Sequence, residues 1–152
     1  MMILLGMSKK GVFKHIDKRL EFAGIALFGY GVFWIVLSTI TLIFAGGMLN
    51  NNSLTMASQV VAVFAIIISV FYIVDAIMIW DGKLYGGFLA VLLVTVTMIC
   101  NLAMLVIGLG LLPFLVLNFA IIPSAFIILS VLGLAINLLI VTLVNAGWEF
   151  LN

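Results

Sequence analysis

Three polar side chains lie in long apolar stretches of the sequence, and they are the residues whose types could do chemistry there. Asp75 comes five residues before Trp80, and Asn101 and Asn137 lie near the middle of later apolar runs. A carboxylate within a membrane is rare and often functional, so Asp75 could bind a proton or a cation. The two asparagines could line a path for a polar substrate or ion.

Asp75 also has a purely structural interpretation. It would lie only about 7–8 Å from the end of its helix at 1.5 Å per residue. At that depth it could form an ion pair with Lys83, Lys18 or Arg19, or accept a hydrogen bond from a tyrosine or serine hydroxyl. The shallow depth favours this structural role near the membrane surface.

The two asparagines have a structural interpretation as well. Adjacent antiparallel helices could bring Asn101 and Asn137 together, with Thr97 and Ser130 nearby. Hydrogen bonds between helices in a membrane contribute about 0.6 kcal/mol on average. We favour this packing role over a substrate path.

No other set of residues predicts a reaction. His15 is the only histidine and Cys100 the only cysteine, so neither can build a metal or haem site alone. No nucleophile accompanies a base and an orienting group, as covalent catalysis requires. We therefore expect no catalytic, cofactor-binding or metal-binding residues, and no enzyme activity of the chain's own.

The composition indicates where such a chain must reside. Of its 152 residues, 67% are hydrophobic and 7% are charged, and the mean hydropathy is +1.51. Soluble domains contain about 25% charged residues. Six basic and five acidic side chains cannot cover the surface of a soluble fold of this size. The sequence therefore predicts an integral membrane protein.

The positions of the charges predict how often the chain crosses the membrane. Residues 22–74 and 84–148 contain no Asp, Glu, Lys or Arg. One helical pass takes about 20 apolar residues, so each run accommodates two passes and the turn between them. Two hairpins, and hence four membrane-spanning helices in an all-α fold, are the simplest prediction.

We expect a single membrane domain over residues 1–152. The spans are predicted at residues 22–45, 55–80, 86–111 and 124–146. Residues 113–123 have a proline at each end and are either an interfacial segment or the bent start of the fourth helix, because proline removes a helical hydrogen bond. The first apolar stretch exceeds the signal-peptide core of about 7–15 residues, which favours an uncleaved anchor.

Residues 8–20 are predicted to form a short amphipathic helix in the headgroup region. Apolar residues share one face of this segment and basic residues occupy the rest. The possible contacts to lipid headgroups are Lys9, Lys10, Lys14, Lys18 and Arg19. Because this cluster adjoins a membrane span, it suits anionic lipids better than nucleic acid.

The basic residues also predict the orientation of the chain. Five of the six Lys and Arg residues precede the first span, and Lys83 lies between the second and third. Loops rich in Lys and Arg stay in the cytoplasm. Both termini and the Lys83 turn are therefore expected on the cytoplasmic side of the plasma membrane.

A stripe of small or weakly polar residues along each predicted span marks its contact face. In the first span Gly24, Gly31, Ser38 and Ala45 recur every seven residues. The other stripes are Ser58, Ala62, Ala65, Ser69, Tyr72 and Ala76; Gly87, Ala90, Val94, Thr97, Asn101, Met104 and Gly108; and Phe126, Ser130, Gly133, Asn137 and Ile140. A seven-residue step implies left-handed packing, so we expect a left-handed four-helix bundle.

This arrangement resembles a known kind of protein. Two hairpins are joined by Trp80-Asp81-Gly82-Lys83-Leu84-Tyr85-Gly86, and the last span ends at Trp148-Glu149-Phe150. These features are similar to small uncharacterised four-helix membrane proteins of archaea and bacteria. The resemblance implies the fold, and it implies no activity and no site residues.

Function is less constrained than fold. We expect first a non-catalytic accessory or structural subunit of a larger integral membrane complex, such as a respiratory enzyme or membrane monooxygenase. Its partners would be membrane lipids and other membrane subunits, and it should have no internal cavity. The alternative is a small transporter or channel, possibly oligomeric, with a polar path from Asp75 to Asn101 or Asn137. A membrane enzyme fits least well.

Overall fold

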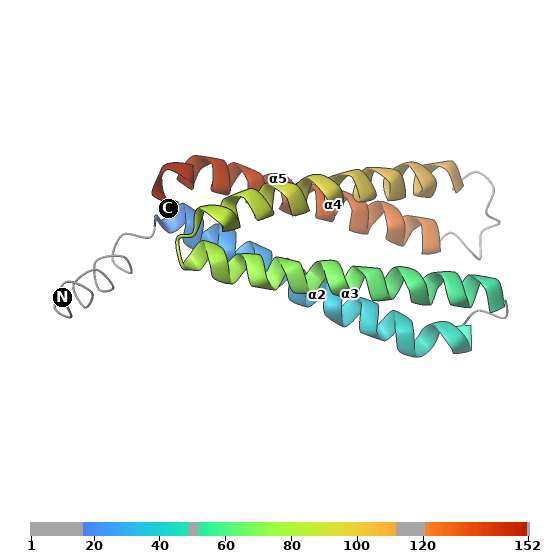
Figure 1. Ribbon diagram of the computed structural model, residues 1–152. Helices are drawn as coiled ribbons and strands as arrows, with labels where there is room; N and C mark the ends of the chain where they lie inside the picture. Colours follow the sequence, from blue (N-terminus) through green and yellow to red (C-terminus); the bar gives the residue numbers. More distant parts are fainter. Residues whose placement is uncertain (1–16, 49–51, 112–120, 152) are drawn as a thin grey trace, which may run out of the picture.

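The computed structural model describes residues 17–48, 52–111 and 121–151. Within these ranges the chain is helical and contains no strand (Figure 1). The elements are α2 (Lys18–Met48), α3 (Asn52–Trp80), α4 (Leu84–Leu111), α5 (Ile121–Gly147) and the 3-10 helix η2 (Trp148–Phe150). Most of the predicted interfacial helix at 8–20, with Lys9, Lys10 and Lys14, lies outside the described residues, as does most of 113–123.

Each of the four long helices contains a stretch long and apolar enough to cross a membrane. These stretches are Lys18–Phe44, Ser58–Trp80, Leu84–Val106 and Ile127–Phe150. A helix bonds its own backbone N–H and C=O groups, which is why apolar runs of this length adopt it in lipid. The expected all-helical fold with four potential membrane spans is confirmed.

The helices extend a few residues beyond the predicted spans. α2 begins at Lys18, where Asp17 Oδ1 accepts a hydrogen bond from the backbone N–H of Arg19 at 3.3 Å. α5 begins at Ile121, which places Pro123 in the first helical turn. Proline is tolerated there because the first N–H groups of a helix have no partner within the helix.

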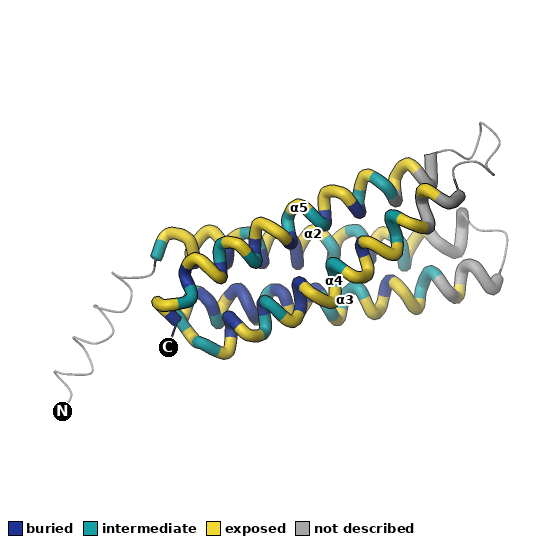
Figure 2. The backbone as a smooth tube through the Cα atoms, turned by 90° about the horizontal axis from the view of Figure 1, so that it is seen from above, coloured by how far each residue is buried: buried dark blue, intermediate teal, exposed yellow. Residues whose placement is uncertain are grey.

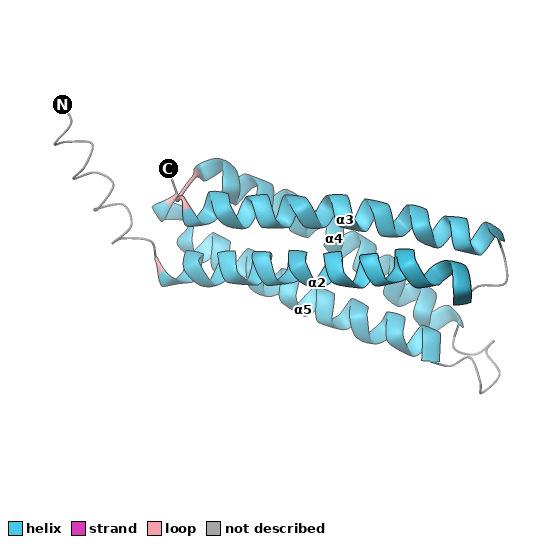
Figure 3. Cartoon of the chain, turned by 90° about the horizontal axis from the view of Figure 1, so that it is seen from below, coloured by secondary structure: helices cyan, strands magenta, loops and turns pink. Residues whose placement is uncertain are grey.

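Two helical hairpins make up the bundle. α2 packs along α3 and α4 packs along α5, while smaller contacts join α2 to α5 and α3 to α4. Figures 1 and 3 show the hairpins closest together near the C-terminus and spreading apart towards their other ends. We call the end with residues 81–83 and η2 the C-terminal end of the bundle.

A tight turn joins the two hairpins. Gly82 has φ of +69° and is the one residue with positive φ in the described part of the chain. Its conformation lets the N–H of Lys83 bond to Met78 O at 3.0 Å, closing the end of α3 as a Schellman-type cap. Glycine is favoured at this position because other residues are strained there.

The predicted contact stripes coincide with the buried faces of the helices (Figure 2). Of the predicted stripe residues, those that are buried are Gly24, Gly31, Ser38, Ala62, Ser69, Tyr72, Ala76, Gly87, Ala90, Val94, Asn101, Ser130, Gly133, Asn137 and Ile140. Large apolar core residues gather at the C-terminal end, where Leu20, Leu27 and Ile79 are nearly inaccessible. The apolar core of the described bundle is therefore concentrated at this end.

Candidate polar site inside the bundle

A buried cluster of polar side chains joins all four helices in the middle of the bundle. Tyr30 of α2 lies at the centre of this cluster. The Tyr30 hydroxyl accepts hydrogen bonds from Nδ2 of Asn101 at 3.4 Å and from Nδ2 of Asn137 at 3.5 Å. Both asparagines are buried, one on α4 and the other on α5. The structure thus brings together the two asparagines that the sequence singled out, through a tyrosine that it did not.

Tyr72 of α3 completes this cluster. Its hydroxyl donates to Asn137 Oδ1 at 3.0 Å and shares a hydrogen bond of 2.6 Å with Thr97 Oγ1. The rings of Tyr30 and Tyr72 meet edge to face with centroids 5.2 Å apart. Because every helix contributes, the polar cluster fixes the relative positions of the two hairpins. We call Tyr30, Tyr72, Thr97, Asn101 and Asn137 the polar cluster.

Small residues make room for these polar side chains. A Cβ atom added to Gly133 of α5 would lie 2.6 Å from Nδ2 of Asn101. A Cβ atom added to Gly31 of α2 would lie 2.8 Å from the backbone oxygen of Ser69. Glycine at these positions therefore permits the close helix approach that seats the polar cluster.

Asp75 lies one helical turn from Tyr72 on the buried face of α3. It is 0% exposed, and neither carboxylate oxygen has a hydrogen-bond partner among the described residues. The ion pair considered from the sequence is absent within the described residues, where Lys83 lies 3.3 Å from Asp81 and Arg19 lies 3.6 Å from Asp17. Asp75 faces the core, whereas those basic side chains lie on the exposed end of the bundle.

The basic residues of α2 occupy the C-terminal end. Lys18 is exposed, and Arg19 donates from Nη1 to the carbonyl oxygen of Ala146 at 3.0 Å. That carbonyl belongs to the last turn of α5, where a cation offsets the unpaired carbonyl groups of the helix end. Arg19 therefore ties α2 to α5 in addition to any contact with headgroups.

A cavity of about 260 Å³ lies beside the polar cluster, between α2, α3 and α4. Its wall is largely apolar and aromatic, and it includes Trp34, Phe64 and Ile68. The polar side chains that border it belong mainly to the cluster: Tyr30, Tyr72, Thr97 and Asn101, with Ser69 beside them. Because Val61, Phe64 and Cys100 of its lining are exposed, the cavity is partly open to the outside of the bundle.

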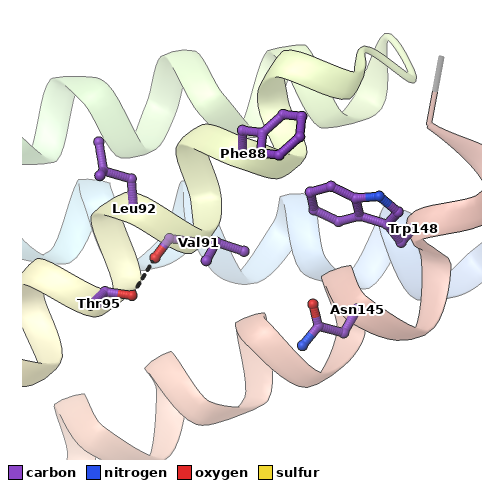
Figure 4. Close-up of a pocket in the computed structure, with 6 residues that line it drawn as sticks. All are labelled: Phe88, Val91, Leu92, Thr95, Asn145 and Trp148. Carbon is purple, nitrogen blue, oxygen red and sulfur yellow. Dashed lines mark hydrogen bonds between the residues drawn. The ribbon is translucent and has the colours of Figure 1, made fainter.

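A second, more open hollow lies on the face of α4 and α5 near the C-terminal end. Its volume is about 460 Å³, and Figure 4 shows Phe88, Thr95, Asn145 and Trp148 around it. The rings of Phe88 and Trp148 meet edge to face at 5.0 Å. Thr95 Oγ1 donates to Val91 O at 2.7 Å, so its hydroxyl is satisfied within α4. None of the residues that line this surface hollow belongs to the polar cluster.

Sequence reasoning missed Tyr30 and the cavity. Tyr30 lies on the same helical face as Ala23 and Leu27, at steps of seven and three residues, and all three are buried. A tyrosine in the middle of a span needs a hydrogen-bond partner for its hydroxyl, and this signal could have identified it. The cavity depends on how the hairpins spread, which no residue pattern specifies.

The cluster contains hydroxyl and amide groups, and Asp75 adds one carboxylate. In the described part of the chain, no three His, Cys, Asp or Glu side chains come together as a metal site would require. These groups can donate and accept hydrogen bonds, relay a proton, or surround a small cation. Comparison with models of known protein families, with curated proteins and with solved structures finds no match to the chain.

Proposed function

We propose that the chain is a small membrane transporter or channel for a proton or small cation, with Asp75 as the ion-binding group. The observation that carries this proposal is the complete burial of an unpartnered carboxylate beside the polar cluster. A charged group without a partner in a membrane interior costs several kcal/mol. Binding a proton or a cation removes that cost, so Asp75 is suited to load and unload one.

The surroundings of Asp75 supply a route on one side and a barrier on the other. Tyr72, one helical turn from Asp75 on α3, bonds to Thr97 and Asn137 of the polar cluster. Towards the C-terminal end, Leu20 and Ile79 close the core. An ion that reaches Asp75 along the polar cluster would require the hairpins to move before it could leave at that end.

Flux through purified protein in liposomes tests this proposal. Wild-type protein is expected to dissipate a proton or Na⁺ gradient, and Asp75→Asn to abolish the flux, because an amide cannot exchange a charge. Asp81→Asn is the matched control: Asp81 is an exposed partner of Lys83 in the α3–α4 turn, so its flux should stay at the wild-type level. Equal flux in Asp75→Asn and wild type would refute the proposal.

A non-catalytic accessory subunit of a larger integral membrane complex, such as a respiratory enzyme or membrane monooxygenase, is the second candidate. It is favoured by the apolar exterior, where large side chains such as Phe22, Phe33 and Phe71 are exposed on the outer faces of α2 and α3. Other membrane subunits would cover part of this surface and lipids the rest. Neither candidate gives the chain a catalytic role.

Purification in mild detergent separates the two candidates. An accessory subunit is expected to co-purify in fixed stoichiometry with other membrane proteins, which mass spectrometry would identify. A homogeneous preparation that contains only this chain, as a monomer or homo-oligomer, would count against the accessory role.

Topology and location form part of the same proposal. We propose a left-handed bundle in the plasma membrane, with both termini and the α3–α4 turn on the cytoplasmic side. Residues 8–16, the part of the predicted amphipathic helix that precedes α2, would lie among anionic headgroups, with Lys18 at the start of α2. The support is the position of the basic residues, five of which precede the first span.

A further inference from the structure

We infer that the cavity between α2, α3 and α4 binds the chain of a membrane amphiphile that has a neutral hydroxyl head. The inference goes beyond ion transport, and it rests on the wall, the mouth and the polar end of the cavity. Each of these features points to a ligand that enters from the lipid and not from water.

The wall determines the body of the ligand. Apolar and aromatic side chains make up most of it, and none of its lining residues is charged. An apolar cavity of this kind excludes water and takes up apolar molecules. At about 260 Å³ the cavity is smaller than the range of about 300–1,000 Å³ typical of complete small-molecule sites. It therefore suits part of a hydrocarbon chain.

The mouth determines the direction of entry. Val61 and Phe64 of α3 and Cys100 of α4 line the cavity and are also exposed on the outside of the bundle. α3 and α4 touch much less than the helices within each hairpin do. The cavity consequently opens sideways between these two helices, onto the surface that lipid chains cover.

The polar end determines the head group. Tyr30 and Asn101 both border the cavity, and their mutual hydrogen bond measures 3.4 Å. This exceeds the usual N–H···O distance of about 2.7–3.2 Å, so both groups retain capacity for a stronger bond. A hydroxyl can donate to one and accept from the other, whereas a charged head would find no counter-ion among the lining residues.

Photolabelling of the full-length protein in lipid nanodiscs tests this inference. The probe is hexadecanol with a diazirine in mid-chain, and its matched probes are the corresponding alkane and alkyl-trimethylammonium. Hexadecanol is expected to label the stretches of α3 and α4 that line the cavity, as mapped by mass spectrometry. Labelling of that segment at equal yield by all three probes would overturn the inference.

Two pairs of variants localise the site. Ala65→Trp fills the cavity and should reduce hexadecanol labelling at least tenfold, while Val63→Trp, on the exposed face of α3, should leave it unchanged. Tyr30→Phe should weaken hexadecanol labelling about fivefold, the effect of one neutral hydrogen bond, without changing alkane labelling. Equal labelling of Ala65→Trp and Val63→Trp would contradict the inference.

A third test uses the wild-type protein, so its result does not depend on whether a variant folds. Cys100 is the only cysteine and lines the cavity mouth. Hexadecanol should slow its reaction with a maleimide several-fold, and the alkyl-trimethylammonium should not; equal rates would contradict the inference. Asp75→Asn should still bind hexadecanol while it loses ion flux, so failure of one proposal is distinguishable from failure of the other.

Discussion

Asp75 and Tyr72 lie one turn apart on the same face of α3, and their surroundings satisfy only one of them. The Tyr72 hydroxyl bonds to Thr97 and Asn137, whereas both oxygens of Asp75 are buried without a partner among the described residues. Buried polar groups in proteins nearly always have partners. The unsatisfied carboxylate therefore does not stabilise the fold, which is why we assign it an ion-binding role.

Replacing Asp75 should accordingly cost little stability. We expect Asp75→Asn to unfold at a free energy equal to or above that of the wild type, because no hydrogen bond to the carboxylate is lost and the charge is removed. Denaturation in mixed detergent micelles, followed by circular dichroism, measures this. A loss of more than about 1 kcal/mol, the contribution of a typical hydrogen bond, would indicate a structural role instead.

Tyr72 should behave in the opposite way. Tyr72→Phe removes a hydroxyl that bonds to two helices and should lower the free energy of unfolding by about 1 kcal/mol, at about 0.6 kcal/mol for each bond. Tyr85→Phe is the control, since Tyr85 is 78% exposed. Equal effects of the two substitutions in the same unfolding assay would show that the cluster contributes nothing to stability.

The residue types of the candidate site could be predicted in part. Asn101, Asn137 and Asp75 stand out because polar side chains are costly in apolar runs. The expected ion pair of Asp75 is absent from the described structure because sequence distance gives only depth along a helix. Which face Asp75 occupies depends on helix rotation, and α3 turns it into the core, where Ala76 is also buried, and away from the exposed Lys83.

At the scale of elements, small residues decide how closely α2 approaches α3. A Cβ atom on Gly31 would meet the backbone of α3, which cannot move aside as a flexible side chain can. Gly24 packs against a side chain, the indole ring of Trp80, and Trp80 Nε1 donates to Glu21 O at 3.4 Å. The seven-residue spacing of these glycines thus corresponds to a real contact line.

Gly31→Ala should therefore destabilise the first hairpin, and Gly29→Ala should not. The first substitution forces the two backbones apart and is expected to cost about 1–3 kcal/mol. Gly29 has nothing within 4 Å of an added Cβ, so alanine there should be neutral or stabilise the helix by up to about 1 kcal/mol. Thermal unfolding of both variants in detergent measures the difference, and similar midpoints would contradict the packing described.

Element boundaries could be predicted to within a few residues. Charge-free runs locate the spans, and Gly82 with Lys83 locates the α3–α4 turn. The ends differ because local hydrogen bonds, such as that from Arg19 N to Asp17 Oδ1, start α2 before the apolar run begins. Apolar composition predicts which residues span the membrane, whereas capping hydrogen bonds determine the residue at which the helix begins.

At the scale of the molecule, the two hairpins are held together at one end and spread at the other. The large core residues gather at the C-terminal end, and the cavity lies nearer the spreading ends. This shape could not be predicted from the stripes, because a stripe identifies a contact face but not how far along it two hairpins stay in contact. The asymmetry is what gives the polar cluster an open side.

The proposed topology makes a prediction that site-directed labelling can check. In a Cys100→Ser background, Met56→Cys lies near the start of α3 and Lys83→Cys lies in the turn that follows its end. A membrane-impermeant maleimide should label Met56→Cys from outside intact cells, and should label Lys83→Cys only after the membrane is opened. Labelling of Lys83→Cys from outside, or of the amino terminus and Lys83 on opposite sides, would refute the arrangement.

The bonds between hairpins have a consequence for biosynthesis. Tyr30 and Tyr72 leave the ribosome in the first hairpin, but their partners Thr97, Asn101 and Asn137 are made later. Arg19 likewise reaches its carbonyl partner Ala146 only when α5 is complete. Until then the first half carries unsatisfied hydroxyls in lipid, a state in which insertion chaperones and membrane proteases could distinguish unfinished chains from finished ones.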